Sequence, residues 1–208
     1  MNSFETDMKR AVCSVNFLIG LLLEIFILIK CGIETDLFTV SVPVAVTLPY
    51  ATAWINDYQS GFLKAYLPRC GIPAYIAGKF FACGISGGSM LGIACFVYLH
   101  TQAGKDVKIN IALFFLSGML WAVVAAALAA VSNSRYIAYG GSFVLFYVLV
   151  ILHERYFEEL YCLYPVEWYN PGHTWIFDDM GIILLCAAII LIIFFIYYET
   201  LRRRIERV

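Results

Sequence analysis

The residue types that could perform chemistry are thinly scattered along this chain, and the best local pair is His153 with Glu154. A zinc peptidase of the His-Glu-x-x-His type needs two imidazoles on one helix face to bind the metal and a glutamate to activate water. Phe157 stands where the second histidine would be, and His100 and His173 are isolated. We therefore expect that the chain is not an enzyme by itself and binds no metal.

Nucleotide chemistry is also not expected within the chain. A phosphate-binding loop needs Gly-x4-Gly-Lys-Ser/Thr, in which backbone amides hold the phosphates and the hydroxyl binds Mg²⁺. Gly71, Gly78 and Lys79 have the wrong spacing, and Phe80 has no hydroxyl. The seven cysteines include no Cys-x-x-Cys pair, which favours packing over a metal or disulfide framework. We expect no cofactor bound by this chain, so any ATP and Mg²⁺ belong to a partner.

One carboxylate, Glu24, lies inside a long apolar run. A charge in lipid is costly, so Glu24 should face protein or a water-filled cavity. A functional hypothesis gives it contact with a cationic substrate or a proton-linked step. The simpler hypothesis, which the sequence favours, is a hydrogen bond to a neighbouring helix near the outer membrane edge.

Small residues gather in a later apolar run, where Gly84, Gly88 and Gly92 repeat at a spacing of four. Glycines on one helix face let a second helix backbone approach closely. The pattern predicts either tight packing within the chain, which we favour, or a seam between two copies.

The elements that position these residues follow from the composition. The 208-residue chain is 62% hydrophobic and 14% charged, with a mean hydropathy of +0.81, whereas soluble domains are about half apolar and about a quarter charged. Within lipid, only helices pair every backbone polar group inside their own segment. We therefore predict an all-α polytopic membrane protein with one transmembrane domain over 1–208. The six predicted spans are 11–29, 37–54, 76–99, 109–131, 136–152 and 180–198.

Lysine and arginine fall unevenly on the two sides of these spans, and cytoplasmic loops carry the excess of such residues. Most of the 14 are on the side of the termini: Lys9, Arg10, Lys64, Arg69, Lys79, Arg135, Arg202, Arg203, Arg204 and Arg207. The others are Lys30, Lys105, Lys108 and Arg155. We predict a bacterial plasma-membrane protein with both termini in the cytoplasm. Without a basic face beyond the membrane flanks, nucleic acid is not an expected partner.

Two segments outside the spans are predicted to lie at the membrane surface. Before the first span, Phe4, Met8, Ala11 and Val12 recur at helical spacing between charged residues, as in an interfacial helix. Between spans five and six, the segment 153–179 combines Trp168, Tyr169 and Trp175 with prolines and acidic residues. Aromatic residues of this kind favour the membrane boundary, so we expect short re-entrant or interfacial helices there.

The predicted cytoplasmic loop 55–75 has the most unusual polar pattern of the chain. Phe62, Ala65 and Tyr66 share one face of a short predicted helix, which Pro68 ends. An amphipathic helix held between two spans can fit a groove of a soluble partner, with aromatic residues as anchors. It can equally be an ordinary loop lying on lipid, and the pattern alone does not separate these two.

The order of residues in this loop resembles that of type 2 ABC transporter permeases. An acidic residue is followed by a Ser-Gly pair, basic residues, and a Tyr-Ile-x-Gly-Lys entry into the third span, and Leu48-Pro49-Tyr50 precedes them. The surface helix, six spans and broken outer segment extend the resemblance over the chain. It implies a coupling helix, and with its aromatic anchor the predicted partner surface comprises Asp57, Ser60, Gly61, Phe62, Lys64 and Arg69. Asp57 stands where glutamate is commoner in the family, which puts a salt bridge of the longer side chain in doubt.

What the resemblance implies is the permease half of an ATP-driven exporter. Such a subunit pairs with a second permease, a copy or a paralogue, and a separate cytosolic ABC ATPase drives it. Its substrate could be a hydrophobic peptide, a lipid or a drug. One alternative is the substrate-capture membrane subunit of an importer, which docks through small residues on a membrane helix. The other is a membrane sensor or scaffold without transport.

Overall fold

The computed structural model describes residues 3–102, 109–175 and 177–207, apart from the side chains of Ser3, Lys64 and Ala65. All regular elements among these residues are helices, which confirms the all-α prediction for this part of the chain. In chain order they are α1 (Ser3–Val12), α2 (Val15–Cys31), α3 (Asp36–Ala45), α4 (Ala53–Gln59), α5 (Phe62–Cys70), α6 (Ile72–Thr101), α7 (Ile111–Ser132), α8 (Arg135–Tyr156), the 3-10 turns η1 (Tyr161–Leu163) and η2 (Pro165–Trp168), and α9 (Asp179–Ile205).

Four of these helices, α6, α7, α8 and α9, are long and apolar enough to cross a membrane. They correspond to the third to sixth predicted spans. The pair α1 and α2 qualifies as a fifth span if its bend of 53° is counted as a break within one crossing. These apolar helices fit a membrane protein, and they are fewer than the six continuous spans that the sequence predicted.

The second predicted span, 37–54, is not one continuous helix. α3 ends at Ala45, and α4 begins only at Ala53. Pro49 explains the break, because a proline ring clashes with the carbonyl four residues earlier and has no N–H to donate. The backbone turns instead through tighter bonds, such as Leu48 N to Ala45 O at 3.1 Å. With ten residues, α3 is too short to cross a bilayer alone.

The first predicted span, 11–29, is also divided differently from the expectation. Ser14 interrupts the helix, because its hydroxyl caps α2 by accepting a bond from the Phe17 amide at 3.1 Å. Ala11 therefore belongs to α1, and α2 extends to Cys31. α1 forms the expected N-terminal helix, but Asp7 is 3% exposed and does not lie on a polar outer face.

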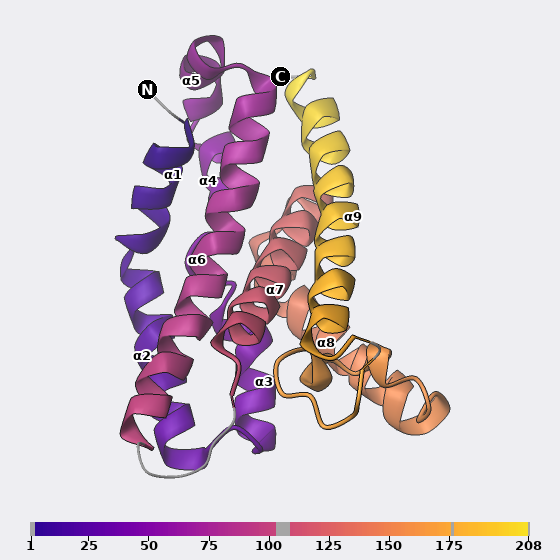
Figure 1. Cartoon of the computed structure of the whole chain (residues 1–208). Helices are drawn as coiled ribbons and strands as arrows, with labels where there is room; N and C mark the ends of the chain where they lie inside the picture. Colours follow the sequence, from indigo (N-terminus) through magenta and orange to yellow (C-terminus); the bar gives the residue numbers. More distant parts are fainter. Residues whose placement is uncertain (1–2, 103–108, 176, 208) are drawn as a thin grey trace.

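The core of the molecule is the contact between α6 and α7. α6 also packs against α1, α2 and α9, which places it at the centre of the bundle (Figure 1). Its small residues permit this closeness, because a Cβ added to Gly88 would lie 2.7 Å from the Phe115 carbonyl oxygen of α7. Gly84 likewise faces Met119 of α7, and Gly92 faces Phe115 at a looser distance. The repeated glycines thus pack within the chain.

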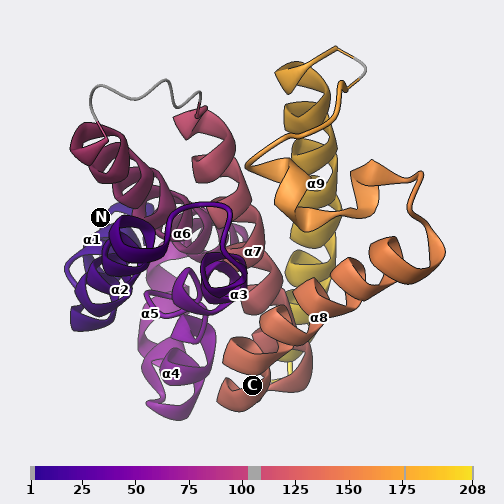
Figure 2. The same cartoon turned by 90° about the horizontal axis from the view of Figure 1, so that it is seen from below.

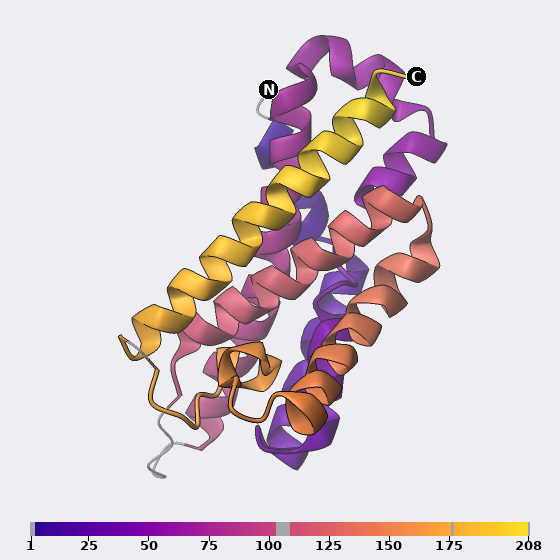
Figure 3. The ribbon, with the colours of Figure 1, turned by 90° about the vertical axis from the view of Figure 1, so that its right-hand side faces the viewer.

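The helices give the molecule two distinct ends. α4 and α5 lie beside the start of α1 and the end of α9, whereas the segment from α8 to α9 lies at the opposite end (Figure 1). α7 packs against both α8 and α9. α8 and α9 diverge from each other in the view from below (Figure 2), and α7 lies between them in the side view (Figure 3). The polypeptide from α3 through the turn at 46–52 to α4 therefore connects the two ends, although it is broken midway.

The basic residues that the sequence assigned to one side gather at the end with α4 and α5. Arg10 contacts Asp57 there, Arg135 donates to Gln59 at 2.6 Å, and Arg204 donates to the Val131 carbonyl at 2.8 Å. Lys105, Asp106 and Lys108 lie outside the described residues. Arg10, Arg135 and Arg204 thus lie at one common end, whereas Lys30 and Arg155 lie near the ends of α2 and α8.

Candidate functional site

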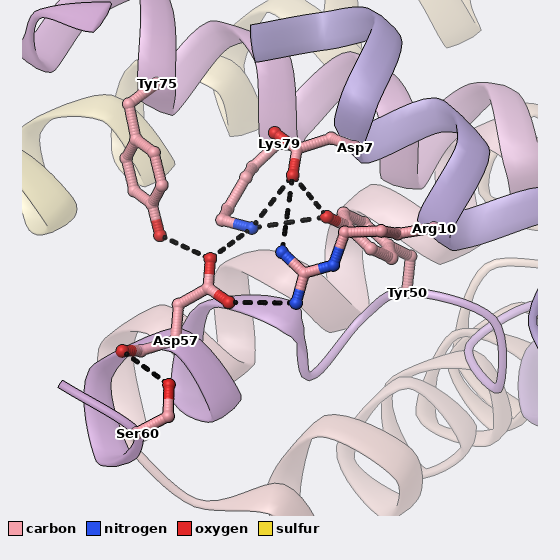
Figure 4. Close-up of polar contacts among 7 residues, drawn as sticks. All are labelled: Asp7, Arg10, Tyr50, Asp57, Ser60, Tyr75 and Lys79. Carbon is pink, nitrogen blue, oxygen red and sulfur yellow. Dashed lines mark hydrogen bonds and ion pairs between the residues drawn. The ribbon is translucent and has the colours of Figure 1, made fainter. Parts of the chain in front are cut away.

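Four charged side chains from three helices meet inside the end of the bundle that carries α4 and α5. Asp7 and Arg10 come from α1, Asp57 from α4, and Lys79 from α6. We call these four residues the charged cluster. Figure 4 shows the cluster with the tyrosines that border it.

Lys79 is the centre of this cluster. Its Nζ lies 2.7 Å from Asp57 Oδ2 and 3.3 Å from Asp7 Oδ1, so one ammonium group joins two helices to its own (Figure 4). The same nitrogen lies 3.3 Å from the Tyr50 hydroxyl and 5.1 Å from the centre of the Tyr75 ring. All three donor directions of an ammonium can therefore be used.

Arg10 closes the cluster from the more exposed side. Its Nη2 lies 3.3 Å from Asp57 Oδ1, and its Nη1 lies 4.0 Å from Asp7 Oδ1. Two tyrosines complete the carboxylate shells: Tyr50 donates to Asp7 at 2.5 Å, and Tyr75 donates to Asp57 at 3.2 Å. Each carboxylate thus receives bonds from both a cation and a phenol.

The charges of the cluster balance although three of the four side chains are buried. Asp57 and Lys79 are 2% and 1% exposed. Two carboxylates face two cations, so the cluster carries no formal net charge. Burying an unpaired charge costs several kcal/mol, whereas a paired and hydrogen-bonded set can be tolerated. Removing any one member would leave a buried charge without its counterpart.

Local sequence explains how each helix presents its part of the cluster. Asp7 and Arg10 are three residues apart on α1, and Tyr75 and Lys79 are four apart on α6, so each pair shares a helix face. α6 begins just after Gly71, whose φ of 76° is readily adopted by glycine, with a proline in its first turn. This start positions Tyr75 and Lys79 one and two turns into the helix.

The predicted partner surface divides into one buried residue and several exposed ones. Asp57 lies in the cluster and is not part of the surface. Ser60 and Gly61 form the exposed turn between α4 and α5, where Gly61 has a φ of 69° and the Ser60 hydroxyl donates to the Asp57 carbonyl. Phe62 and Arg69 are exposed on α5. Lys64 lies within α5, but its side chain is outside the described part of the structure.

A cavity of about 530 Å³ lies between α1 and α5 beside these exposed residues. It is lined by Thr6, Arg10, Phe62, Tyr66, Arg69 and Cys70. The Phe62 and Tyr66 rings stack with centres 4.9 Å apart, and the Arg10 guanidinium lies 5.7 Å from the Phe62 ring centre. Burial and the nearby Asp7 carboxylate raise the pKa of the Cys70 thiol above its usual value. The cavity thus combines aromatic walls with two arginines.

Glu24 is fully buried between α2 and α3. Its Oε2 accepts a hydrogen bond from the Ser41 hydroxyl at 3.3 Å, while no partner for Oε1 is found among the described residues. This contact is of the kind that the simpler hypothesis required, a hydrogen bond to a neighbouring helix. Glu24 does not contact the charged cluster in any interaction that the structure records.

The segment between α8 and α9 is organised around another buried carboxylate, Glu167. It accepts hydrogen bonds from the amides of Gly172 and His173 and from the Trp175 indole, at 3.0, 3.3 and 3.4 Å. η1 and η2 precede this loop as 3-10 turns of three and four residues, where short re-entrant or interfacial helices were predicted. Trp168 and Tyr169 are buried against the bundle, so their rings support the segment from within.

Sequence reasoning missed most of the charged cluster. Asp57 was identified, but Asp7, Arg10 and Lys79 were interpreted only as flanking charges. Asp7 carried a usable signal, because it falls between Phe4 and Ala11 at helical spacing and thus on the apolar face of α1. A charge on an apolar face requires a buried partner.

The described residues contain no group of three or more histidine, cysteine, aspartate or glutamate side chains arranged to hold a metal ion. All seven cysteines are free thiols. The chemistry that the cluster offers is therefore electrostatic and mechanical: it fixes α1, α4 and α6 to one another. Comparison of the chain with protein-family models, curated proteins and solved structures found no match.

Proposed function

We propose that the chain is the permease half of an ATP-driven exporter, in which the hairpin of α4 and α5 receives movement from a separate cytosolic ATPase. The observation that carries this proposal is the attachment of the hairpin to the long helices. Asp57 of α4 bonds to Lys79 of α6 and to Arg10 of α1, at 2.7 and 3.3 Å. This buried four-charge attachment would pass movement of the hairpin on to α6 and α1.

The exposed side of the same hairpin suits a protein partner. Phe62, 39% exposed, and Arg69 border the cavity between α1 and α5, and aromatic and arginine side chains are the commonest anchors of protein interfaces. Arg69 lines the cavity and is not part of the charge-balanced cluster, so it favours an acidic or carboxylate-bearing segment of the partner. The exposed side of the hairpin therefore has an aromatic anchor, Phe62, and a charge, Arg69, that can set the orientation of the bound partner.

The mechanism follows from this connection. When ATP closes the ATPase pair, each ATPase pushes or rotates the hairpin that docks on it. Because Lys79 holds Asp57 inside the bundle, α6 follows, and α1 follows through Asp7 and Arg10. α7 moves with α6 because the two helices are in close contact through Gly88. A second permease would complete the pathway, and the segment 157–178 would cover its far end.

Photocrosslinking in the native membrane tests the proposal directly. A photoreactive residue at position 69 should capture a soluble protein that carries nucleotide-binding motifs, and ATP should change the yield. Ser60→Trp should abolish both capture and transport, because Ser60 is exposed with an ordinary φ of −79° and the bulky ring blocks docking without straining the turn. Gly61→Trp should also abolish transport, but it would additionally strain the left-handed turn.

A matched control uses the opposite end of the molecule. Glu158→Trp adds the same ring at an exposed position in the segment between α8 and α9. That segment lies at the end of the molecule opposite α4 and α5 (Figure 1), so this variant should leave capture unchanged. Capture through α2 instead of α5 would support the importer subunit. If a photoreactive residue captures no nucleotide-binding protein, whether it is placed at position 69 or on α2, the proposal is contradicted.

A further inference from the structure

An apolar groove is lined by residues of α7, α8 and α9 and of the turns η1 and η2. α7 lies between α8 and α9 in Figure 3. The groove has a volume of about 470 Å³, and it is lined almost wholly by apolar side chains, among them Trp121, Val124 and Val131 of α7 and Leu185 and Ile196 of α9. Trp168 of η2 borders it, with its indole N–H already bonded to the Cys162 carbonyl at 3.0 Å. The groove therefore offers contact area and few polar groups.

A second cavity, lined by arginines, lies at the end of this groove nearest the hairpin. Its volume is about 460 Å³, and its lining comprises Tyr58, Thr200, Arg203, Arg204 and Arg207. No carboxylate is among these lining residues, although Arg203 also forms an ion pair with Glu199 of α9 at 3.6 Å. The cavity thus carries a concentration of positive charge that suits an anion.

The two cavities lie on one continuous face of α9. Leu185, Ile189, Ile193 and Ile196 recur at intervals of three and four along the groove, and Thr200, Arg203 and Arg207 continue the same spacing into the basic cavity. Arg204 also donates to the carbonyl of Val131, a residue that lines the groove. The apolar groove therefore leads directly to the arginines.

The length of the groove matches one leaflet of a bilayer. From Leu185 to Ile196 the helix rises by about 16 Å, at 1.5 Å per residue. Half of a hydrocarbon core of about 30 Å is about 15 Å. An acyl chain that fills the groove would place its headgroup at the level of Arg203, Arg204 and Arg207.

We propose that this composite site binds an anionic phospholipid, with an acyl chain in the groove between α7, α8 and α9 and the phosphate-bearing headgroup at the arginines. The inference does not depend on the proposed transport function. Positive residues at helix ends commonly anchor a protein in the membrane without binding a particular lipid. What distinguishes this site is the pairing of a preformed apolar groove with a cavity lined by arginines at its end nearest the hairpin.

Tryptophan quenching by brominated lipids tests the site. The variant W54F/W175F retains Trp121 and Trp168, both at the groove, and can be placed in phosphatidylcholine bilayers. Phosphatidylglycerol with brominated acyl chains should quench at a much lower mole fraction than brominated phosphatidylcholine. In this background, R204Q/R207Q removes the two arginines of the basic cavity for which the structure gives no ion pair among the described residues. The double variant should raise the mole fraction of phosphatidylglycerol needed for half-maximal quenching by about 30-fold, since each arginine near the surface contributes about a factor of five.

Matched variants separate this site from general attraction by charge. Arg202 is paired with Glu206 and does not line the basic cavity, so R202Q should change the quenching by no more than about twofold. V124F should fill the groove and abolish the preference, whereas L191F, at an exposed position outside the groove, should preserve it.

Three results would overturn the proposal. The first is equal quenching by the two brominated lipids in the W54F/W175F background. The second is a loss in R202Q as large as that in R204Q/R207Q, which would indicate only a diffuse charge effect. The third is release of the quenching by inorganic phosphate alone, which would indicate an anion site that does not require the lipid tail.

Discussion

The Nζ of Lys79 lies 2.7 Å from Oδ2 of Asp57, and both side chains are almost fully buried. This bond joins the short helix α4 to the longest helix of the molecule, α6. Asp7 shares the same ammonium at 3.3 Å, so the N-terminal helix is fixed at the same point. The hairpin of α4 and α5 therefore cannot move far without either moving α6 or separating buried charges.

Replacing Lys79 by methionine should destabilise the protein strongly. The substitution keeps the length of the side chain but leaves Asp7 and Asp57 buried with Arg10 as their only cation in the cluster. Breaking a buried ion pair typically costs about 3–5 kcal/mol. Thermal unfolding in detergent measures the loss, and Arg69→Gln, an exposed control, should change stability by no more than about 0.5 kcal/mol.

The double variant D57N/K79M isolates the coupling between these residues. Because both partners are removed together, it should lose less stability than the sum of D57N and K79M. Strict additivity of the two single variants would mean that Lys79 and Asp57 do not stabilise one another.

Alanine at Gly88 should destabilise the contact between α6 and α7. The added Cβ would lie 2.7 Å from a backbone oxygen of α7, which cannot rotate away. Overpacking of this kind costs about 1–3 kcal/mol. Gly140→Ala is the matched control on α8, because nothing lies within 4 Å of its Cβ position. There the better helix propensity of alanine should give up to about 1 kcal/mol of stabilisation. Equal melting shifts for the two variants would contradict the packing.

The Cys70 thiol should react slowly with maleimide at neutral pH. Burial raises the pKa of this thiol, so less thiolate is present at a given pH, and the thiolate is the reactive form. The rate should therefore increase about tenfold per pH unit until the pH passes the raised pKa. A variant that keeps only Cys70 can be followed from pH 7 to 10, with a variant that keeps only the exposed Cys31 as reference. A pH profile with its midpoint at the ordinary thiol pKa would contradict the prediction.

The two ends of the molecule should lie on opposite sides of the membrane. Ser60→Cys, in the turn of the hairpin, and Glu158→Cys, after α8, both place a thiol at an exposed position in a background without other cysteines. A membrane-impermeant maleimide added to intact cells should label position 158 and spare position 60. Labelling of both positions, or of position 60 alone, would show that the orientation drawn from the lysine and arginine pattern is wrong.

The sequence by itself predicted what depends on local pattern. Runs of apolar residues of span length predicted α6, α7, α8 and α9, and the uneven lysine and arginine content predicted that cations gather at one end. Both signals are readable because a helix and its hydropathy are set within about 20 neighbouring residues. The glycine spacing likewise predicted a close helix contact, although not which helix would supply the partner surface.

Only the tertiary structure decided which distant residues meet. Asp7, Asp57 and Lys79 belong to three helices, and nothing in the local pattern of any one of them names the other two as partners. The break at Pro49 is another feature that the hydropathy pattern did not reveal. Hydropathy indicates a span over 37–54, whereas the ring of a single proline divides it. Burial of charge is a property of packing between helices, so a residue that appears to be a surface cation in sequence, such as Lys79, can be the centre of the core at that end of the molecule.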